Sequence, residues 1–139
     1  MPALRRNEVA ARRCVELFNQ RRPREWVEAC YAEKAEWMEL PLPSTPNGRC
    51  GGREALQAAA EQVLRLIPNR QMQIRNLVVD EDQVALEIDW EGTAAATVGG
   101  LAAGSTVRFR VATFLTFVDG LIVRQTDYCV PLRPEGPRS

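Results

Sequence analysis

The sequence of 139 residues contains no histidine. Histidine is the commonest metal ligand and general base, so its absence excludes every Ser-His-Asp triad and leaves only carboxylates or scattered thiols for a metal site. An excess of one charge is also missing, because Lys plus Arg and Asp plus Glu both total 18. Balanced charge provides no net field to attract nucleic acid or an acidic membrane, and we expect neither partner.

Long apolar runs are absent as well. Residues 1–8 carry early charges without the apolar core of a signal peptide, and no stretch approaches membrane-spanning length. We therefore expect a soluble, cytoplasmic protein. The cysteines show no CxxC spacing, and they are Cys14, Cys30, Cys50 and Cys129. We interpret them as reduced thiols, three of them inside predicted helices or strands, and expect neither a metal nor a cofactor.

Apolar residues in the first half of the chain recur at helical spacing. This pattern predicts three amphipathic helices, over residues 4–21, over 23–32, and from Gly51 to Pro68. Between the second and third helices, residues 34–40 alternate as in a strand, and a loop with three prolines follows. Prolines fix the backbone and remove donors, so this loop is stiff and lies outside any central strand.

Beyond Pro68 the periodicity changes from helical to alternating. Four strands are predicted, near 71–79, 84–92, 105–118 and 121–130. The order helix, helix, strand, helix and four strands indicates an α+β fold, in which a curved, mostly antiparallel sheet wraps around three helices. We expect a single domain over 1–130, and a loose tail over 131–139.

Two carboxylates lie among apolar neighbours on predicted strand faces. Asp127 shares a face of the last strand with Leu121 and Cys129, and Glu39 shares a face of the first strand with Trp37. Burial of a carboxylate is costly, and an apolar site raises its pKa towards the range useful for proton transfer. Either the two are catalytic, or Asp127 bonds to a neighbouring strand or an arginine while Glu39 reaches water.

A second acidic set occupies one face of a single predicted strand. Glu87, Asp89 and Glu91 alternate there with apolar residues, and Arg108 and Arg110 alternate likewise in the next strand. Cross-strand ion pairs explain this pattern, and the alternative is that Asp89 or Arg110 lines a site. The large aromatic side chains likewise belong either to the core or to the wall of a pocket.

The order of elements and three stretches of sequence resemble known enzymes. The stretches are Trp37 to Pro43, Gly52 to Leu56, and Phe117 to Tyr128. They are similar to limonene epoxide hydrolases and SnoaL-like polyketide cyclases, which share the cone-shaped nuclear transport factor 2-like fold with ketosteroid isomerases. The resemblance covers roughly residues 8–130 and implies an enzyme for an apolar small molecule that forms a homodimer through its open sheet face.

The resemblance also implies roles for individual residues. Asp127 matches the aspartate that activates water in the epoxide hydrolases and a catalytic aspartate of the cyclases. Glu39 matches a water-binding asparagine of the former and the proton-shuttling aspartate of the isomerases, and Asp89 matches the proton-donating aspartate of the epoxide hydrolases. Cys14 and Ala112 stand where the isomerases have oxyanion donors, and the catalytic histidine of the cyclases has no counterpart.

These observations predict acid–base catalysis by carboxylates in an apolar pocket, with Asp127, Glu39 and Asp89 as the candidate catalytic residues. Epoxide hydrolysis or rearrangement, or SnoaL-like cyclisation, is the leading interpretation. A ketone isomerase or aldol-type cyclase is one alternative, and a non-catalytic ligand-binding or dimerisation domain is another. The side chains expected to contact substrate are Trp37, Tyr31, Phe18, Cys14, Val63, Trp90, Ala112 and Phe114.

Overall fold

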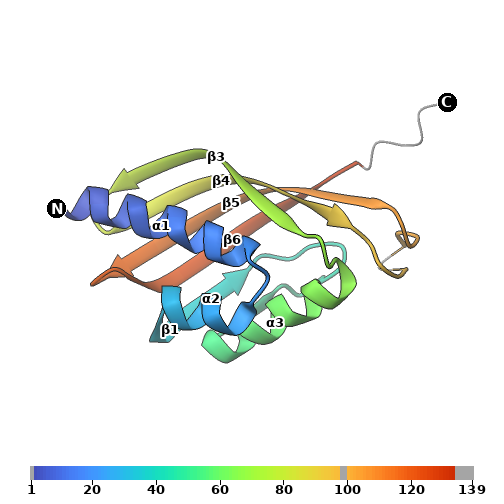
Figure 1. The fold of residues 1–139 in the computed structure, drawn as a ribbon, viewed down its shortest axis with the longest axis horizontal. Helices are drawn as coiled ribbons and strands as arrows, with labels where there is room; N and C mark the ends of the chain where they lie inside the picture. The colour runs from blue at the N-terminus through green and yellow to red at the C-terminus, as the bar shows by residue number, and fades with distance from the viewer. Residues whose placement is uncertain (1, 98–99, 134–139) are drawn as a thin grey trace.

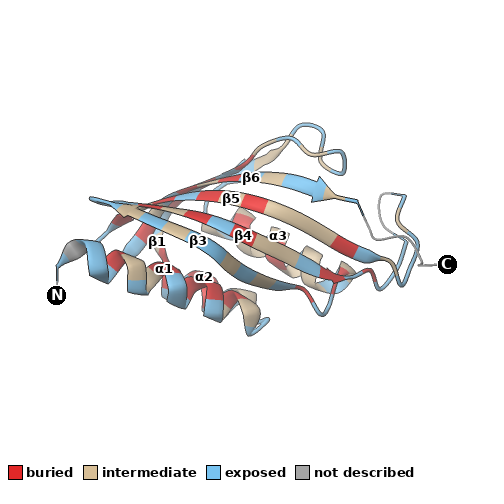
Figure 2. Cartoon of the chain, turned by 90° about the horizontal axis from the view of Figure 1, so that it is seen from above, coloured by how far each residue is buried: buried red, intermediate tan, exposed pale blue. Residues whose placement is uncertain are grey.

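The computed structural model describes residues 2–97 and 100–133. Its three helices are α1 (Ala3–Asn19), α2 (Pro23–Cys30) and α3 (Arg53–Leu66). Its six strands are β1 (Tyr31–Glu39), β2 (Arg49–Gly51), β3 (Gln71–Asp80), β4 (Gln83–Thr93), β5 (Thr106–Val118) and β6 (Leu121–Leu132). The helices lie against one face of a single curved sheet (Figures 1 and 2), so the predicted α+β class is confirmed.

The sheet places the first and last strands of the chain side by side. Its order is β2-β1-β6-β5-β4-β3, with β1 and β6 parallel and the other described neighbours antiparallel. A parallel pair needs a long crossover connection, which α3 and four further strands provide here. Glu39 and Asp127, far apart in sequence, thereby become register partners.

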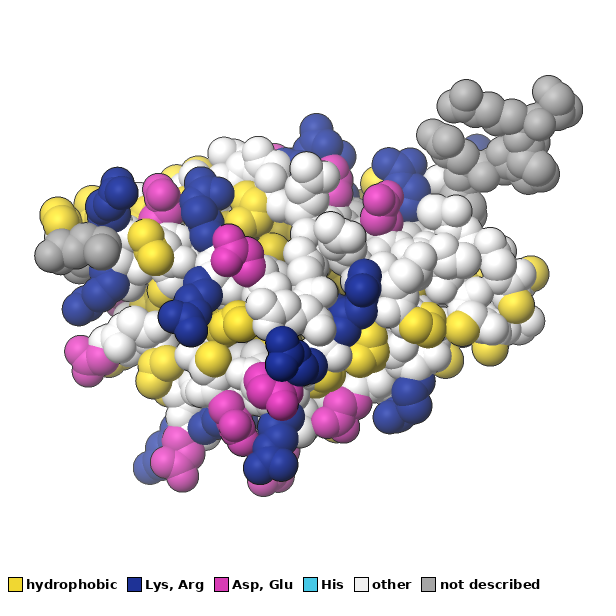
Figure 3. Space-filling model, in the orientation of Figure 1, with side chains coloured by type: hydrophobic (Ala, Val, Ile, Leu, Met, Phe, Trp, Pro, Cys, Tyr) yellow, Lys and Arg dark blue, Asp and Glu magenta, His cyan; other side chains and the backbone are white. Residues whose placement is uncertain are grey.

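The hydrophobic core fills the space between the helices and the concave face of the sheet. Val27 of α2, Val84 of β4 and Ile122 of β6 are each 1% exposed. Along α1, buried residues recur at three- and four-residue spacing and alternate with exposed ones (Figure 2), so one stripe of the helix packs on the core. On the face shown in Figure 3, side chains of both charges are interspersed over the surface.

The second helix ends earlier than predicted. Tyr31 falls within the predicted helix 23–32, but α2 ends at Cys30 and Tyr31 is extended, with φ −114° and ψ 136°. Tyr31 instead begins β1 and is the register partner of Ile122. Aromatic residues fit the pleated, half-buried surface of a sheet, and pairing with β6 outweighs the continued helical periodicity.

A bulge in β6 changes which residues face the core. The sequence predicts Leu121 on the face of Asp127, but Leu121 is 36% exposed and Ile122 is buried. The register between β5 and β6 shifts between Thr116 and Phe117, so one extra residue of β6 is accommodated there. Because strand side chains alternate with a period of two, this shift exchanges the faces of the residues before it.

Two element boundaries also differ from the prediction. Arg49–Gly51 forms the short edge strand β2, where the sequence predicted a loop and the start of a helix. The last strand includes Pro131 and Leu132, which were assigned to the tail. The register with β1 stops before Pro131, so that side of the strand is free and a proline is tolerated. The rest of the predicted tail, 134–139, lies outside the described residues.

Gly92 allows β4 to approach the end of α3 closely. A Cβ atom at Gly92 would lie 2.3 Å from Cγ2 of Ile67 and 3.1 Å from Cα of Arg70. Gly92→Ala should therefore lower the free energy of unfolding by about 1–3 kcal/mol, because overpacking forces backbone shifts. Gly52→Ala is the matched control, since its nearest contact would be an ordinary 3.6 Å. Equal denaturant midpoints for the two variants would contradict this account.

Candidate active site

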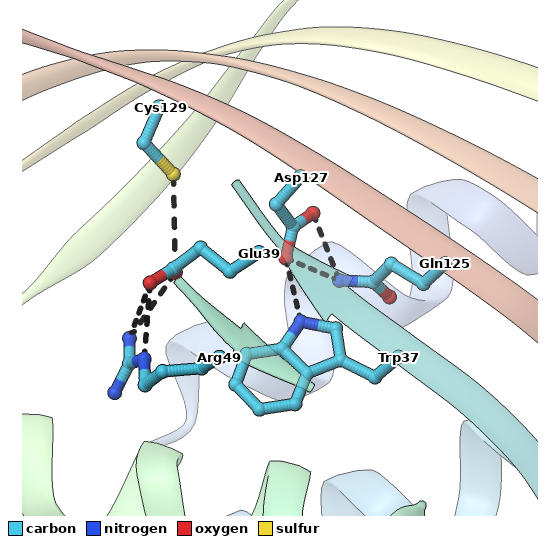
Figure 4. A network of polar contacts seen from close by, with 6 residues as sticks. All are labelled: Trp37, Glu39, Arg49, Gln125, Asp127 and Cys129. Carbon is cyan, nitrogen blue, oxygen red and sulfur yellow. Dashed lines mark hydrogen bonds and ion pairs between the residues drawn. The ribbon is translucent and has the colours of Figure 1, made fainter. Parts of the chain in front are cut away.

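The two buried carboxylates come from neighbouring strands and lie close together (Figure 4). Glu39 of β1 and Asp127 of β6 both point to the inner face of the sheet, with exposed fractions of 8% and 9%. The backbone N–H of Leu40 donates to the carbonyl oxygen of Asp127 at 3.1 Å, which joins the two strands at this point. The sequence prediction that both carboxylates face the apolar interior is confirmed.

Asp127 is surrounded by neutral hydrogen-bond donors. Trp37 Nε1 donates to Oδ2 at 2.9 Å, and the hydroxyl of Thr113 donates to Oδ1 at 2.8 Å. The amide nitrogen of Gln125 donates to both carboxylate oxygens, at 3.1 and 3.0 Å. Tyr31 donates its hydroxyl proton to Oε1 of Gln125, which extends the network to the start of β1. These contacts fix the orientation of the carboxylate.

The environment of Asp127 favours its protonated form more than water does. Burial raises the pKa of Asp127 because the charged form loses its hydration, while hydrogen bonds from Trp37, Gln125 and Thr113 oppose this effect. The charge of Arg49 also lowers the pKa of Asp127, but burial is the largest effect. A carboxyl group in this position binds a proton more readily than an exposed aspartate, which suits reversible proton transfer.

Glu39 is held by a cation. Nε and Nη2 of Arg49 donate to Oε1 and Oε2 of Glu39 at 3.0 and 3.1 Å, which forms a bidentate ion pair. Burial raises the pKa of Glu39, Arg49 opposes that rise, and the charge of Asp127 adds to it. The guanidinium of Arg49 also lies over the ring of Trp37, 5.5 Å from its centroid. Arg49 therefore balances the negative charge of Glu39, whereas the hydrogen-bond donors to Asp127 are neutral.

Cys129 borders the carboxylate pair on the side of Glu39. Its Sγ lies 3.9 Å from Oε2 of Glu39 (Figure 4), and the side chain is half-buried. Burial and the nearby carboxylates raise the pKa of Cys129 to about 12, so the thiol is protonated at neutral pH. All four cysteines are free thiols.

Asp89 lies on the opposite face of the sheet from Asp127. Its carboxylate accepts from Arg75 Nη1 and from Arg110 Nε, both at 2.7 Å, and these arginines lower its pKa. Arg110 also lies 3.8 Å from Glu87, so the cross-strand ion pairs predicted from the sequence are present. Because residues of a strand alternate between its faces, β4 directs Asp89 outward, and we remove it from the candidate site.

Ala112 and Phe114 are also on the outer face. In β5 the buried positions include Val111 and Thr113, so the residues that alternate with them face solvent. Phe114 is 52% exposed and packs edge to face against Tyr128, with ring centroids 5.8 Å apart. This corrects the expectation that Ala112 and Phe114 contact a substrate in the interior.

Three of the other predicted contact residues form core packing beneath α2. Phe18 and Tyr31 both pack edge to face on Trp26, with centroid distances of 5.1 and 5.2 Å. Cys14 is buried beside Cys30. Its pKa is raised by a hydrogen bond with the thiol of Cys30 and, in addition, by burial. Of these three residues, Tyr31 also reaches the polar network.

The concave face is less completely covered towards one end. Ile88 of β4 is 2% exposed, but Trp90, the next inward position, is half-buried and packs on half-buried Phe109 with centroids 5.6 Å apart. Cys129, which follows Asp127 on the inner face of β6, is half-buried too, as is Val63 of α3. Solvent therefore contacts part of the apolar inner face beyond Ile88 and Asp127.

Two surface hollows lie elsewhere on the molecule. One of about 440 Å³ lies near the start of α1, between Asn7 and Glu81. The other, of about 150 Å³, is lined by Gln71, Arg108 and the aromatic pair Trp90 and Phe109. Neither of them includes Glu39 or Asp127. Neither hollow therefore provides a route for a substrate to the carboxylates, and the half-buried part of the inner face is the side from which a substrate would approach.

Sequence reasoning missed three residues that contact the carboxylates. Thr113 is a hydroxyl residue on the otherwise apolar inward face of β5, and that break in the pattern is a signal that could have identified it. Gln125 shares the face of Asp127 two residues earlier, but nothing in the sequence indicates that it bonds to the carboxylate. Arg49 follows an irregular loop, so no periodicity indicates that it meets Glu39.

The arrangement suits proton transfer within an apolar interior. Among the residues that the structure describes, no group of three or more His, Cys, Asp or Glu side chains is placed to hold a metal ion. In that same part of the chain, no helix combines the length and apolar character needed to cross a membrane. The site contains the carboxyl group of Asp127, whose pKa is raised, the ion-paired carboxylate of Glu39 and the protonated thiol of Cys129.

Solved structures of similar fold come from several bacteria. AclR of Streptomyces galilaeus, a candidate hydroxylase, is 20% identical with a TM-score of 0.78, and the match covers 94% of this chain and 82% of that one. IdmH of Streptomyces antibioticus, a candidate polyketide cyclase, is 19% identical with a TM-score of 0.77 and coverages of 88% and 91%. A candidate ketosteroid isomerase from Kribbella flavida is 24% identical, with a TM-score of 0.63 and coverages of 98% and 85%.

These TM-scores show a shared cone-shaped fold. No curated protein sequence matches the chain significantly. The family model for the SnoaL-like domain, however, matches residues 11–125, which is most of the chain. The chain therefore belongs to the SnoaL-like domain family, within the nuclear transport factor 2-like superfamily.

Proposed function

We propose that this protein is a small-molecule cyclase or isomerase in which Asp127 transfers a proton on a mostly apolar substrate. Membership of the SnoaL-like family supports this class of activity. The observation that carries the proposal is the environment of Asp127: it is buried, oriented by Trp37, Thr113 and Gln125, and forms no ion pair with any residue that the structure describes. Such a group can accept a proton and return it.

The proposed reaction begins beside a substrate carbonyl. The ionised carboxylate of Asp127 removes a proton from the neighbouring carbon, and the electron pair of the broken C–H bond forms an enolate. In a cyclase that carbon then attacks a second carbonyl of the same molecule, and the resulting alkoxide takes up the proton that Asp127 removed, which regenerates the base. In an isomerase the proton returns to a different carbon. Glu39, held by Arg49, positions the substrate or a water molecule beside Asp127.

Epoxide hydrolysis or rearrangement is the second candidate. It requires an acid that protonates the epoxide oxygen while the base activates the nucleophile. Asp89 is on the outer face, so Glu39 is the remaining acid. Its pKa is raised by burial and by Asp127, although Arg49 opposes that rise, and this elevation is the observation that supports the second candidate.

Asp127→Asn should lower kcat by about 10²- to 10⁴-fold, because an amide cannot accept the proton. The assay has two arms. A β,γ-unsaturated cyclohexenone in deuterium oxide reports proton transfer by deuterium uptake and double-bond migration. Cyclohexene oxide in heavy-oxygen water reports epoxide opening by isotope incorporation into the diol. Activity in the first arm supports the leading proposal, and activity in the second arm alone supports the second candidate.

Asp89→Asn is the matched control for this experiment. It makes the same chemical change on the outer face, and we expect it to leave turnover unchanged. A folded Asp127→Asn variant that retained wild-type turnover would refute the proposed role, and a protein inactive in both arms that still binds these ligands would favour a non-catalytic binding domain.

The activity should depend on pH through Asp127. Because burial raises the pKa of this group, the acid limb of kcat/KM should have its midpoint above the ordinary aspartate value of about 3.9. The raised pKa of Asp127 also contributes to the free energy of unfolding. This contribution is fully present below the pKa of Asp127 in the unfolded chain, and it is lost as the pH rises through the higher pKa in the folded protein. Urea unfolding and rates measured across this window check both effects, and a midpoint at or below the ordinary value would contradict them.

We further propose a homodimer formed through the outer face of the sheet. Met38, Phe114, Tyr128 and Val130 are 50%, 52%, 45% and 56% exposed there, and strands β1, β6 and β5 place them side by side. Phe114→Asp should convert the dimer to a monomer in sedimentation velocity. Val9→Asp, at an exposed position on α1, is the control and should remain dimeric. A monomeric wild-type protein would refute the proposal.

A further inference from the structure

The side chain of Gln125 lies between a phenol and a carboxylate. Its Oε1 accepts the hydroxyl proton of Tyr31, and its Nε2 donates to both oxygens of Asp127. All three side chains are buried, with exposed fractions of 4% for Tyr31 and 9% for the other two. Water therefore competes little for these hydrogen bonds, and each group depends on the orientation of its neighbours.

We propose that Tyr31 is a positioning residue that holds the amide of Gln125 with its nitrogen towards Asp127 and so keeps the carboxylate in its proton-accepting state. The inference deepens the proposed function, because it rests on Asp127 acting as the base. Tyr31 does not contact Asp127 directly and acts through Gln125.

The side-chain amide of a glutamine exchanges the places of its oxygen and nitrogen when it rotates by half a turn about the Cγ–Cδ bond. In the exchanged orientation, Oε1 of Gln125 would face the oxygens of Asp127. Two acceptors in contact repel each other unless Asp127 is protonated and donates. The orientation of the amide and the protonation of Asp127 are therefore coupled, and whatever stabilises one orientation changes the affinity of Asp127 for a proton.

Tyr31 favours the observed orientation because its hydroxyl proton then has a good acceptor. In the exchanged orientation the amide nitrogen would donate to the phenol oxygen, and the phenol proton would need a different acceptor. The neighbouring groups on the helix side of Tyr31 are the thiols of Cys14 and Cys30, which are weak acceptors. A buried hydroxyl without a partner is costly, so Tyr31 disfavours the exchanged state.

Tyr31→Phe leaves the other titratable side chains around this network in the protein. Those that face Asp127 and Tyr31 are Glu39 of β1, Arg49 of β2, Cys129 of β6, Cys14 of α1 and Cys30 of α2. β5 contributes the neutral Thr113. Asp89 of β4 points to the outer face, and the charged residues of α3 are exposed or half-buried. A shift in the titration of Asp127 can thus be attributed to the amide.

Tyr31→Phe should raise the pKa of Asp127 and move the acid limb of kcat/KM to higher pH by about half a unit to one unit. The kcat on the alkaline plateau should be retained, because the carboxylate is then ionised in both proteins. Tyr128→Phe is the matched control: it removes the only other tyrosine hydroxyl of the chain, from an exposed position on the outer face, and should leave the profile in place.

Carbon-13 NMR of the Asp127 carboxyl group measures the same shift without any substrate. Gln125→Leu should raise the pKa of Asp127 as well, and Tyr31→Phe should add nothing in that background, because both changes interrupt the same chain of bonds. If Tyr31→Phe does not fold, fluorotyrosine incorporated into Tyr128→Phe labels Tyr31 alone. Fluorotyrosine is the stronger donor and should shift the titration in the opposite direction.

The outcomes separate this inference from the proposed function. An unchanged Asp127 titration in Tyr31→Phe, or a full additional shift in the double variant, would overturn the positioning role of Tyr31. If instead the titration moves as expected but Asp127→Asn retains turnover, the positioning of the amide stands and the assignment of Asp127 as the base fails.

Discussion

The parallel pairing of β1 with β6 is the constraint on which the candidate site depends. It sets Trp37 and Glu39 beside Gln125 and Asp127, which are about ninety residues away in the chain. Closing so long a segment costs conformational entropy, which burial of the core and of this network must offset. Trp37 of β1, Thr113 of β5 and Gln125 of β6 all donate to Asp127, so the orientation of the carboxylate depends on the pairing of these three strands.

The two carboxylates of the site are buried to the same degree but stabilised in different ways. Glu39 has a guanidinium in bidentate contact, which favours its charged form directly. Asp127 has neutral donors, which orient it and oppose only part of the cost of burial. This difference in partners, at similar burial, is the basis for proposing Asp127 as the base and Glu39 as the residue that positions the substrate or water.

Local periodicity predicted the elements that carry the site and the inward direction of Glu39 and Asp127, because alternation within a strand is a property of neighbouring residues. It also placed Asp89 opposite the apolar face of its strand, and the structure agrees with that pattern rather than with the role implied by resemblance. The same alternation places Ala112 and Phe114 on the face of Arg108 and Arg110 in β5, a signal that the prediction of substrate contact did not use. The contact of Arg49 with Glu39 depends on the conformation of the preceding loop, which no periodic pattern in the sequence predicts.

The failure of periodicity at Tyr31 coincides with the polar network. The position of Tyr31 fits the helical pattern of residues 23–32 because its ring packs in the core against Trp26. Its backbone nevertheless belongs to β1, and its hydroxyl donates to Gln125. One residue thus meets an apolar requirement with its ring and a polar one with its oxygen, which is the use of a buried tyrosine. A phenylalanine would satisfy the core alone, so the hydroxyl is explained by the network it completes and not by packing.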